Sequence, residues 1–229
     1  MTNPAPPPLT AAESSRLTRH ITLASVGMAA TLVTLKAAVW LASGSVALLA
    51  SAADSGLDLL ASLVTFFAVR YAAAPPDAEH RFGHGKAEAF ASLIQGGLVF
   101  ASAALIGREA IHNLLRPHEL HQEGWAVAVM ALSTIMTGLL IAAQTHVLKR
   151  TASVAVAGDR AHYATDLASN AVALLGIGAS VLFGWGNLDA IAALIITVLL
   201  LWGAIGVFRQ AANQLMDHEL PDDDRARIV

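Results

Sequence analysis

The stretch SAADSGLDLLASLV, residues 51–64, places two aspartates four positions apart in an otherwise apolar run. The surrounding segment, Val46–Ala74, is long enough to cross the ~30 Å hydrocarbon core of a bilayer as a single helix. Asp58 lies two positions from the middle of that segment. A charged carboxylate at this depth costs about 2.5–3.5 kcal/mol on insertion scales, so Asp54 and Asp58 need a partner that offsets the cost.

The composition of the whole chain agrees with a membrane location. Of its 229 residues, 55% are hydrophobic and only 14% are charged, and the mean hydropathy is +0.58. A soluble domain carries about 25% charged residues. The chain has no cysteine, which excludes disulfides and thiolate metal ligands.

Six apolar segments are each long enough to span the bilayer, so the sequence predicts an all-α membrane protein with six transmembrane helices. We expect a cytoplasmic N-terminal tail at 1–19, a transmembrane domain at 20–210 and the start of a cytoplasmic C-terminal region at 211–229. The six segments are Ile21–Ala42, Val46–Ala74, Ala87–Leu115, Trp125–Leu148, Ala152–Gly184 and Leu188–Gln210.

The positions of lysine and arginine predict the orientation, because cytoplasmic loops carry an excess of these residues. One side of the predicted bundle has a single positive residue at a helix end, Arg116. The other side is therefore predicted to be cytoplasmic, with both termini, in a multi-pass protein of the inner membrane. The positive residues on that side are Arg16, Arg19, Arg70, Arg81, Lys86, Lys149, Arg150 and Arg209.

A second polar pair lies in the fifth segment, within GDRAHYATDLASN at 158–170. His162 and Asp166 are four positions apart, like Asp54 and Asp58, so each pair occupies one face of its helix. Two such helices facing each other offer one nitrogen and three oxygen ligands to a divalent cation. That set suits tetrahedral zinc, with iron(II), cobalt, cadmium and manganese less favoured.

A simpler alternative is that each intramembrane acid pairs with a lysine or arginine, or stays protonated. Two pairs at matching depth on separate helices weigh against it, because Lys36 alone cannot pair with three acids. Three carboxylates around a divalent ion leave one excess negative charge, which protons or Lys36 can offset.

Four motifs follow one another over the six segments. They are SGSVALLASAADSGLDLLAS at 43–62, RFGHGKAEAFASL at 81–93, DRAHYATDLASN at 159–170 and LMDHELPDDD at 215–224. With these motifs the chain resembles the cation diffusion facilitator family of metal–proton antiporters, in particular its bacterial zinc and iron efflux members.

The resemblance implies a secondary transporter, not an enzyme, that acts as a homodimer and has zinc as substrate, with cadmium, iron(II) and cobalt as further candidates. By the same resemblance Asp54, Asp58, His162 and Asp166 form the transport site. Many zinc-selective relatives carry histidine at the position of Asp54, so strict zinc selectivity is not expected. The family usually adds a cytoplasmic C-terminal domain of metallochaperone-like α/β fold, which would begin where this chain stops.

A second metal site is predicted in the loop PPDAEHRFGHGKAE, residues 75–88. Asp77, His80 and His84 supply two histidines and one carboxylate, a common set of zinc ligands. The resemblance also implies a peripheral zinc site at these three residues, while the alternative is that the histidines are merely solvated. We further predict an ion pair between Lys86 and Asp217, at the ends of the third and sixth helices.

The expected partners are divalent metal ions, protons and the lipid bilayer, with no nucleic acid. Two other functions remain open. The paired carboxylates could hold magnesium on a diphosphate substrate of an intramembrane transferase, although magnesium disfavours the histidine of the second pair. Alternatively, the protein could be a metal sensor that binds ions without transporting them.

Overall fold

The computed structural model describes residues 10–43, 46–115, 124–183 and 188–217. Within these ranges the chain is all-helical, with no strand, which confirms the predicted fold class. Arg116 and the motif residues after Asp217 lie outside the described residues. The helices are α1 (Ala11–Ser43), α2 (Val46–Ala72), α3 (Lys86–Leu115), α4 (Gly124–Thr151), α5 (Val154–Phe183) and α6 (Leu188–Leu215).

Helix α1 begins at Ala11, ten residues before the predicted start of the first apolar segment. Much of the segment predicted as a tail is therefore helical. Thr10 and Glu13 account for this start: the Glu13 carboxylate accepts the Thr10 backbone N–H at 2.9 Å, and the Thr10 hydroxyl accepts the Glu13 backbone N–H at 3.3 Å. This reciprocal pair is a capping box, and its T-A-A-E signature is visible in the sequence.

Five helices in the described part of the chain are long and apolar enough to cross a membrane: α1, α2, α3, α4 and α6. These five predicted spans are supported by length and composition. Helix α5 is not among them, and it carries Asp159, Arg160, His162 and Asp166 within two turns of one another.

The distribution of side chains between surface and interior is that of a membrane protein. Large apolar side chains lie on the outside, where lipid can solvate them; they include Leu57, Leu60, Phe67, Phe100, Leu139, Trp202 and Ile205. Polar side chains are buried between the helices, where they can bond across them; they include Thr22, Ser25, Ser62, Thr65, Gln95, Gln144 and Asp159.

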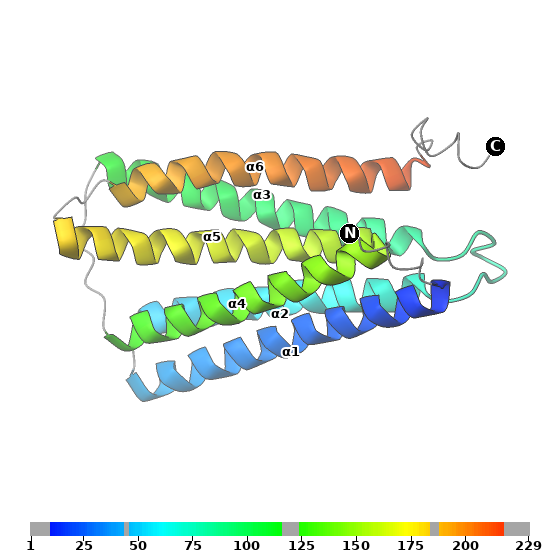
Figure 1. Ribbon diagram of the computed structural model, residues 1–229, viewed down its shortest axis with the longest axis horizontal. Coiled ribbons are helices and arrows are strands. Elements are labelled where there is room, and N and C mark those ends of the chain that lie inside the picture. The colour runs from blue at the N-terminus through cyan, green and yellow to red at the C-terminus, as the bar shows by residue number, and fades with distance from the viewer. Residues whose placement is uncertain (1–9, 44–45, 116–123, 184–187, 218–229) are drawn as a thin grey trace, which may run out of the picture.

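The helices lie roughly along one axis, with α1 against α2, α3 against α6, and α5 in contact with α3, α4 and α6 (Figure 1). Small residues allow close approach between α3 and α6. Ala103 and Ala204 are fully buried, and a Cβ added at Gly107 would lie 2.8 Å from Thr197 Cγ2. Small residues at helix contacts are typical of membrane bundles, where packing and hydrogen bonds hold the helices together.

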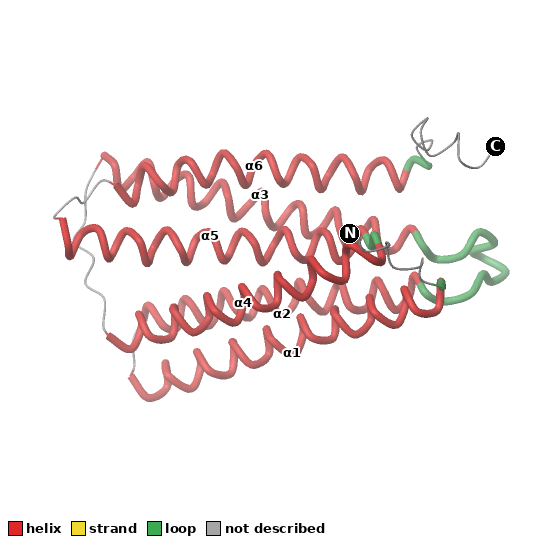
Figure 2. The backbone as a smooth tube through the Cα atoms, in the orientation of Figure 1, coloured by secondary structure: helices red, strands yellow, loops and turns green. Residues whose placement is uncertain are grey.

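One end of the bundle gathers the α2–α3 loop, the α4–α5 connection, the start of α1 and the end of α6 (Figure 2). All eight basic residues that were predicted to share a side belong to these parts of the chain. Their grouping at one end, predicted from the loop charges, is therefore reproduced by the fold.

Candidate metal sites

The intramembrane site depends on how α5 begins. Only Ala152 and Ser153 join α4 to α5. Ala152 adopts a left-handed conformation, φ 50°, which ends α4. The Ser153 hydroxyl accepts the Val156 backbone N–H at 3.4 Å and donates to the Glu88 carboxylate at 2.5 Å. Ser153 thus caps α5 and joins its start to α3.

Three of the four predicted membrane ligands come together between α2 and α5. Asp58, His162 and Asp166 each place a donor atom within 4.8 Å of the others. His162 Nε2 lies 3.1 Å from Asp58 Oδ1 and 3.9 Å from Asp166 Oδ2. The His162 side chain is 5% exposed, and the carboxylates are 14% and 21% exposed. The predicted pairing of an α2 face with an α5 face is therefore observed.

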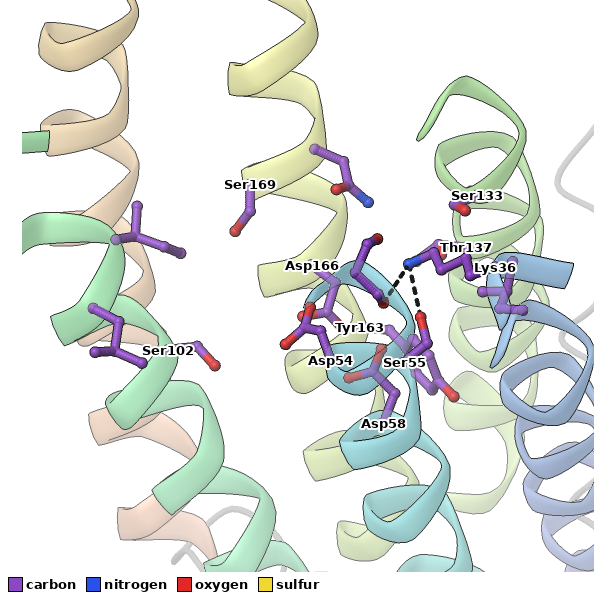
Figure 3. A pocket seen from close by; sticks show the side chains of 15 residues that line it. Lys36, Asp54, Ser55, Asp58, Ser102, Ser133, Thr137, Tyr163, Asp166 and Ser169 are labelled. Carbon is purple, nitrogen blue, oxygen red and sulfur yellow. Dashed lines mark hydrogen bonds between the residues drawn. The ribbon is translucent and has the colours of Figure 1, made fainter. Parts of the chain in front are cut away.

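Asp54 lies outside this three-residue cluster but lines the same cavity of about 240 Å³ as Asp58 and Asp166. Figure 3 shows the three carboxylates grouped at this cavity, with Lys36 approaching from α1. The cavity also carries hydroxyl and amide groups, so its wall offers oxygen ligands and room for water. The polar lining residues besides these four are Ser51, Ser55, Ser102, Ser133, Thr137, Tyr163, Ser169 and Asn170.

Two atoms of the cluster are buried without a hydrogen-bond partner in the described structure: His162 Nδ1 and Asp166 Oδ2. Buried polar atoms are nearly always bonded, because an unmade bond costs about 1–3 kcal/mol. A cation between the carboxylates and His162 Nε2 would satisfy Asp166 Oδ2. The arrangement is therefore chemically suited to a metal ion that exchanges with protons on the same atoms.

A buried network that the sequence reasoning missed supports the His162 end of α5. Asp159 is fully buried one turn before His162, and its two oxygens accept bonds from Gln95 Nε2 at 3.2 Å and Gln144 Nε2 at 2.8 Å. Gln95 also donates to Thr65 Oγ1 at 2.8 Å. Asp159 thus joins α5 to α3 and α4, and through Gln95 to α2.

Tyr163 adds a second connection beside the site. Its hydroxyl lies 2.7 Å from Ser62 Oγ on α2 and donates to the Ser25 carbonyl on α1 at 3.3 Å. The ring is 1% exposed. The face of α5 that carries His162 is therefore fixed against α1 and α2 by hydrogen bonds as well as packing.

The three predicted loop ligands also come together, and they do so on a turn rather than on a helix. Asp77, His80 and His84 form the second cluster of donor atoms within 4.8 Å of one another. Asp77 Oδ1 lies 3.2 Å from His80 Nδ1, and Asp77 Oδ2 lies 3.3 Å from His84 Nε2. Gly83, at φ 84°, makes the turn that returns His84 to the other two residues.

The loop positions its carboxylate with backbone groups. Asp77 Oδ1 accepts the N–H groups of His80 at 2.6 Å and Glu79 at 2.9 Å, and these bonds, the His80 bond first, lower the pKa of the Asp77 carboxyl. Asp77 and His80 are exposed, whereas the His84 side chain is buried against the Tyr71 ring, with centroids 4.4 Å apart.

The predicted ion pair between α3 and the end of α6 is confirmed. Lys86 Nζ lies 2.9 Å from Asp217 Oδ2, and it also donates to the Leu215 carbonyl at 3.0 Å. Asp217 has φ 52°, so Lys86 satisfies one of the last carbonyls of α6 where the helix ends. Both side chains are more than half exposed.

Comparison with known proteins shows the family of the chain. The sequence model of a protein family, described as the cation efflux transmembrane domain, matches residues 22–216. Proteins named "Cation-efflux pump FieF" from Salmonella agona (strain SL483), Salmonella newport (strain SL254) and Salmonella paratyphi A (strain ATCC 9150 / SARB42) are each 36% identical over 214 residues. The matches cover 93% of this chain and 71% of each relative. The chain belongs to the cation efflux family.

Membership of the cation efflux family confirms the resemblance to cation diffusion facilitators. It makes the protein a multi-pass membrane transporter of metal cations and not a catalytic enzyme. The transferase alternative is therefore set aside.

Proposed function

We propose that the protein exports divalent metal ions from the cytoplasm across the inner membrane in exchange for protons, with zinc as the first candidate. The observation that carries this proposal is the buried cluster of Asp58, His162 and Asp166, contributed by two helices of a cation efflux protein. Asp54, from the same cavity, completes the set of four ligands when an ion is present.

The donor set limits the choice of metal. One imidazole nitrogen with carboxylate oxygens suits zinc, and it also accepts iron(II), cadmium and cobalt. With a third carboxylate in place of a second histidine, the site offers more oxygen ligands and so discriminates less strongly in favour of zinc. We therefore expect zinc transport without strict selectivity.

Proton exchange follows from competition for one atom. His162 Nε2 lies 3.1 Å from Asp58 Oδ1, so a proton there is shared with the carboxylate. A metal ion binds only when that proton leaves, because ligation needs the neutral ring and ionised acids. Protonation of the same atoms on the opposite side of the membrane then releases the metal.

The rest of the proposed architecture follows from charge and family. The end of the bundle with the eight basic residues faces the cytoplasm, with the tail before α1 and the region from residue 211 onward, and α5 completes six transmembrane helices. The working unit is a homodimer in the lipid bilayer. The loop cluster of Asp77, His80 and His84 binds zinc at the cytoplasmic surface.

Zinc uptake into proteoliposomes with an acidic interior tests the proposal. The Asp166→Ala variant removes one oxygen ligand and is expected to abolish uptake, while Leu57→Ala, on the lipid-facing side of α2, leaves it within about twofold. Undiminished uptake by Asp166→Ala would contradict the site. Zinc binding without any flux in the unsubstituted protein would instead favour a sensor.

A further inference from the structure

Lys36 is a charged residue of the membrane interior that the metal ligands do not account for. It lies on α1 and is 8% exposed. Its Nζ donates to Ser55 Oγ at 2.7 Å and approaches the Ser51 carbonyl at 3.4 Å, both on α2. Figure 3 shows these two bonds beside the carboxylates of the cavity.

The ammonium group faces the acids without being bonded to one. Among the described residues that line the cavity, Lys36 is the one with a basic side chain. Among the described residues no carboxylate forms an ion pair with Lys36 within 4.0 Å, and its Nζ bonds to Ser55 and Ser51 instead. The carboxylates therefore stay available to an incoming ion while a positive charge remains fixed beside them.

The charges in the cavity balance for one class of ion. Asp54, Asp58 and Asp166 bring three negative charges, and a divalent ion with Lys36 brings three positive charges. A monovalent ion leaves the cavity negative, and a trivalent ion leaves it positive. An uncompensated charge is costly at this depth in the membrane, so a site that is neutral when loaded changes its exposure from one side to the other most readily.

We propose that Lys36 is the fixed counter-charge of the transport site, which makes the site neutral when it holds a divalent ion. This inference rests on the proposed function. It assigns Lys36 two opposing effects: its charge weakens metal binding by repulsion, and it speeds the passage of the loaded site. Lys36 is thus a positioning and specificity residue that does not bind the metal.

Zinc transport by Lys36→Gln and Lys36→Arg in proteoliposomes tests this assignment. In Lys36→Gln we expect KM for zinc to fall about tenfold, because repulsion is removed, and the maximal rate to fall about tenfold, because the loaded site carries a net charge. Lys36→Arg keeps the charge and is expected to stay within about threefold of the unsubstituted protein in both constants.

A double variant separates charge from structure. Lys36→Gln with Asp54→Asn removes one charge of each sign, so the loaded cavity is neutral again. We expect it to transport faster than either single variant, by about fivefold. If Lys36 has only a structural role, the losses in transport rate of the two single variants should add in the double variant, and that outcome overturns the proposal. A Lys36→Gln protein with unchanged KM and maximal rate overturns it as well.

Elution volume and melting temperature in detergent establish that each variant is folded. If Lys36→Gln does not fold, Lys36→Met, which keeps the apolar stem, replaces it. If neither neutral variant folds, the double variant decides: a folded, transporting double variant supports the charge balance, and an unfolded one overturns it. Absence of zinc flux in the unsubstituted protein is a separate result, which refutes the proposed function itself.

Discussion

The two clusters use the same kinds of donor in opposite surroundings. In the membrane, Asp58, His162 and Asp166 are largely buried, and two of their atoms lack a partner in the described structure. In the loop, Asp77 and His80 are exposed, and Asp77 already accepts two backbone N–H bonds. In the membrane cluster the unpartnered atoms include a carboxylate oxygen, Asp166 Oδ2, which an ion or a proton can satisfy. In the loop cluster the carboxylate is hydrogen-bonded, and the unpartnered buried atom among its described residues is His84 Nδ1.

This difference bears on what each cluster can do. A site whose ligands need either a metal or protons couples the two, since neither can leave unless the other replaces it. A site with solvated ligands binds and releases metal without that constraint. The comparison therefore supports our proposal of exchange at the membrane cluster and simple binding at the loop cluster.

The largest expected effect is in the membrane. Asp58→Asn removes the negative charge of the carboxylate nearest to His162 Nε2 and should lower zinc transport at least about 100-fold, measured as the initial rate in proteoliposomes. Asp77→Asn, the matched change in the loop, should lower it only about threefold at saturating zinc. Equal losses of zinc transport in the two variants would contradict the proposal that the two clusters have different roles.

The next effect concerns helix packing, on which the membrane cluster depends. A Cβ added at Gly158 would lie 2.9 Å from Ser92 Oγ and 3.1 Å from Ser92 Cα, so Gly158→Ala should push α5 away from α3. We expect a loss of about 1–3 kcal/mol in the free energy of unfolding. The matched control is Gly138→Ala on α4, where no atom lies within 4 Å and a neutral or slightly stabilising effect is expected. Melting curves in detergent that do not separate the two variants would contradict the close contact.

A smaller effect is expected on zinc binding by the loop cluster, measured at two pH values. Backbone N–H bonds, that of His80 first, lower the pKa of Asp77, so this carboxylate stays ionised as the pH falls through the usual range of an aspartate, and its contribution is lost only below that range. Asp77→Asn should therefore weaken zinc binding to the loop by the same factor, about tenfold, at pH 8 and at pH 6.

The measurement is a zinc titration of Asp77→Asn and of the unsubstituted protein, both in an Asp166→Ala background to remove the membrane site. A ratio of affinities that shrinks toward pH 6 would mean that Asp77 titrates in that interval.

The smallest effect is expected for the pair of Lys86 and Asp217. Both side chains are more than half exposed, and exposed pairs contribute less than about 1 kcal/mol. A double-mutant cycle with Lys86→Ala and Asp217→Ala, followed by thermal unfolding, should give a coupling energy below that value, falling as salt is added. A coupling of several kcal/mol would show that this contact matters far more than its exposure indicates.

The sequence was sufficient where helical periodicity decides the outcome. The i, i+4 spacing places Asp54 with Asp58 and His162 with Asp166, and the structure brings faces of these two helices together. The sequence alone does not indicate which of the two aspartates of α2 lies closer to His162. That register depends on contacts between helices, such as Gly158 against Ser92, and periodicity within one helix carries no information about them.

The Asp159 network shows the same limit. Gln95 is 64 positions from Asp159, and nothing in the sequence around either residue indicates the other as its partner. Only the packing of α3, α4 and α5 makes them partners. The start of α1, in contrast, could have been found, because the T-A-A-E capping signature was present in the sequence.

The short connection between α4 and α5 has a mechanical consequence. Two residues span at most about 7 Å, so the joined ends of these helices stay close together. Gln144, about two turns back from the end of α4, binds Asp159 and links the same helices a second time. The connection and this hydrogen bond thus join α4 to α5 at two points along their length. We therefore expect a motion that changes the depth of His162 in the membrane to move α4 together with α5.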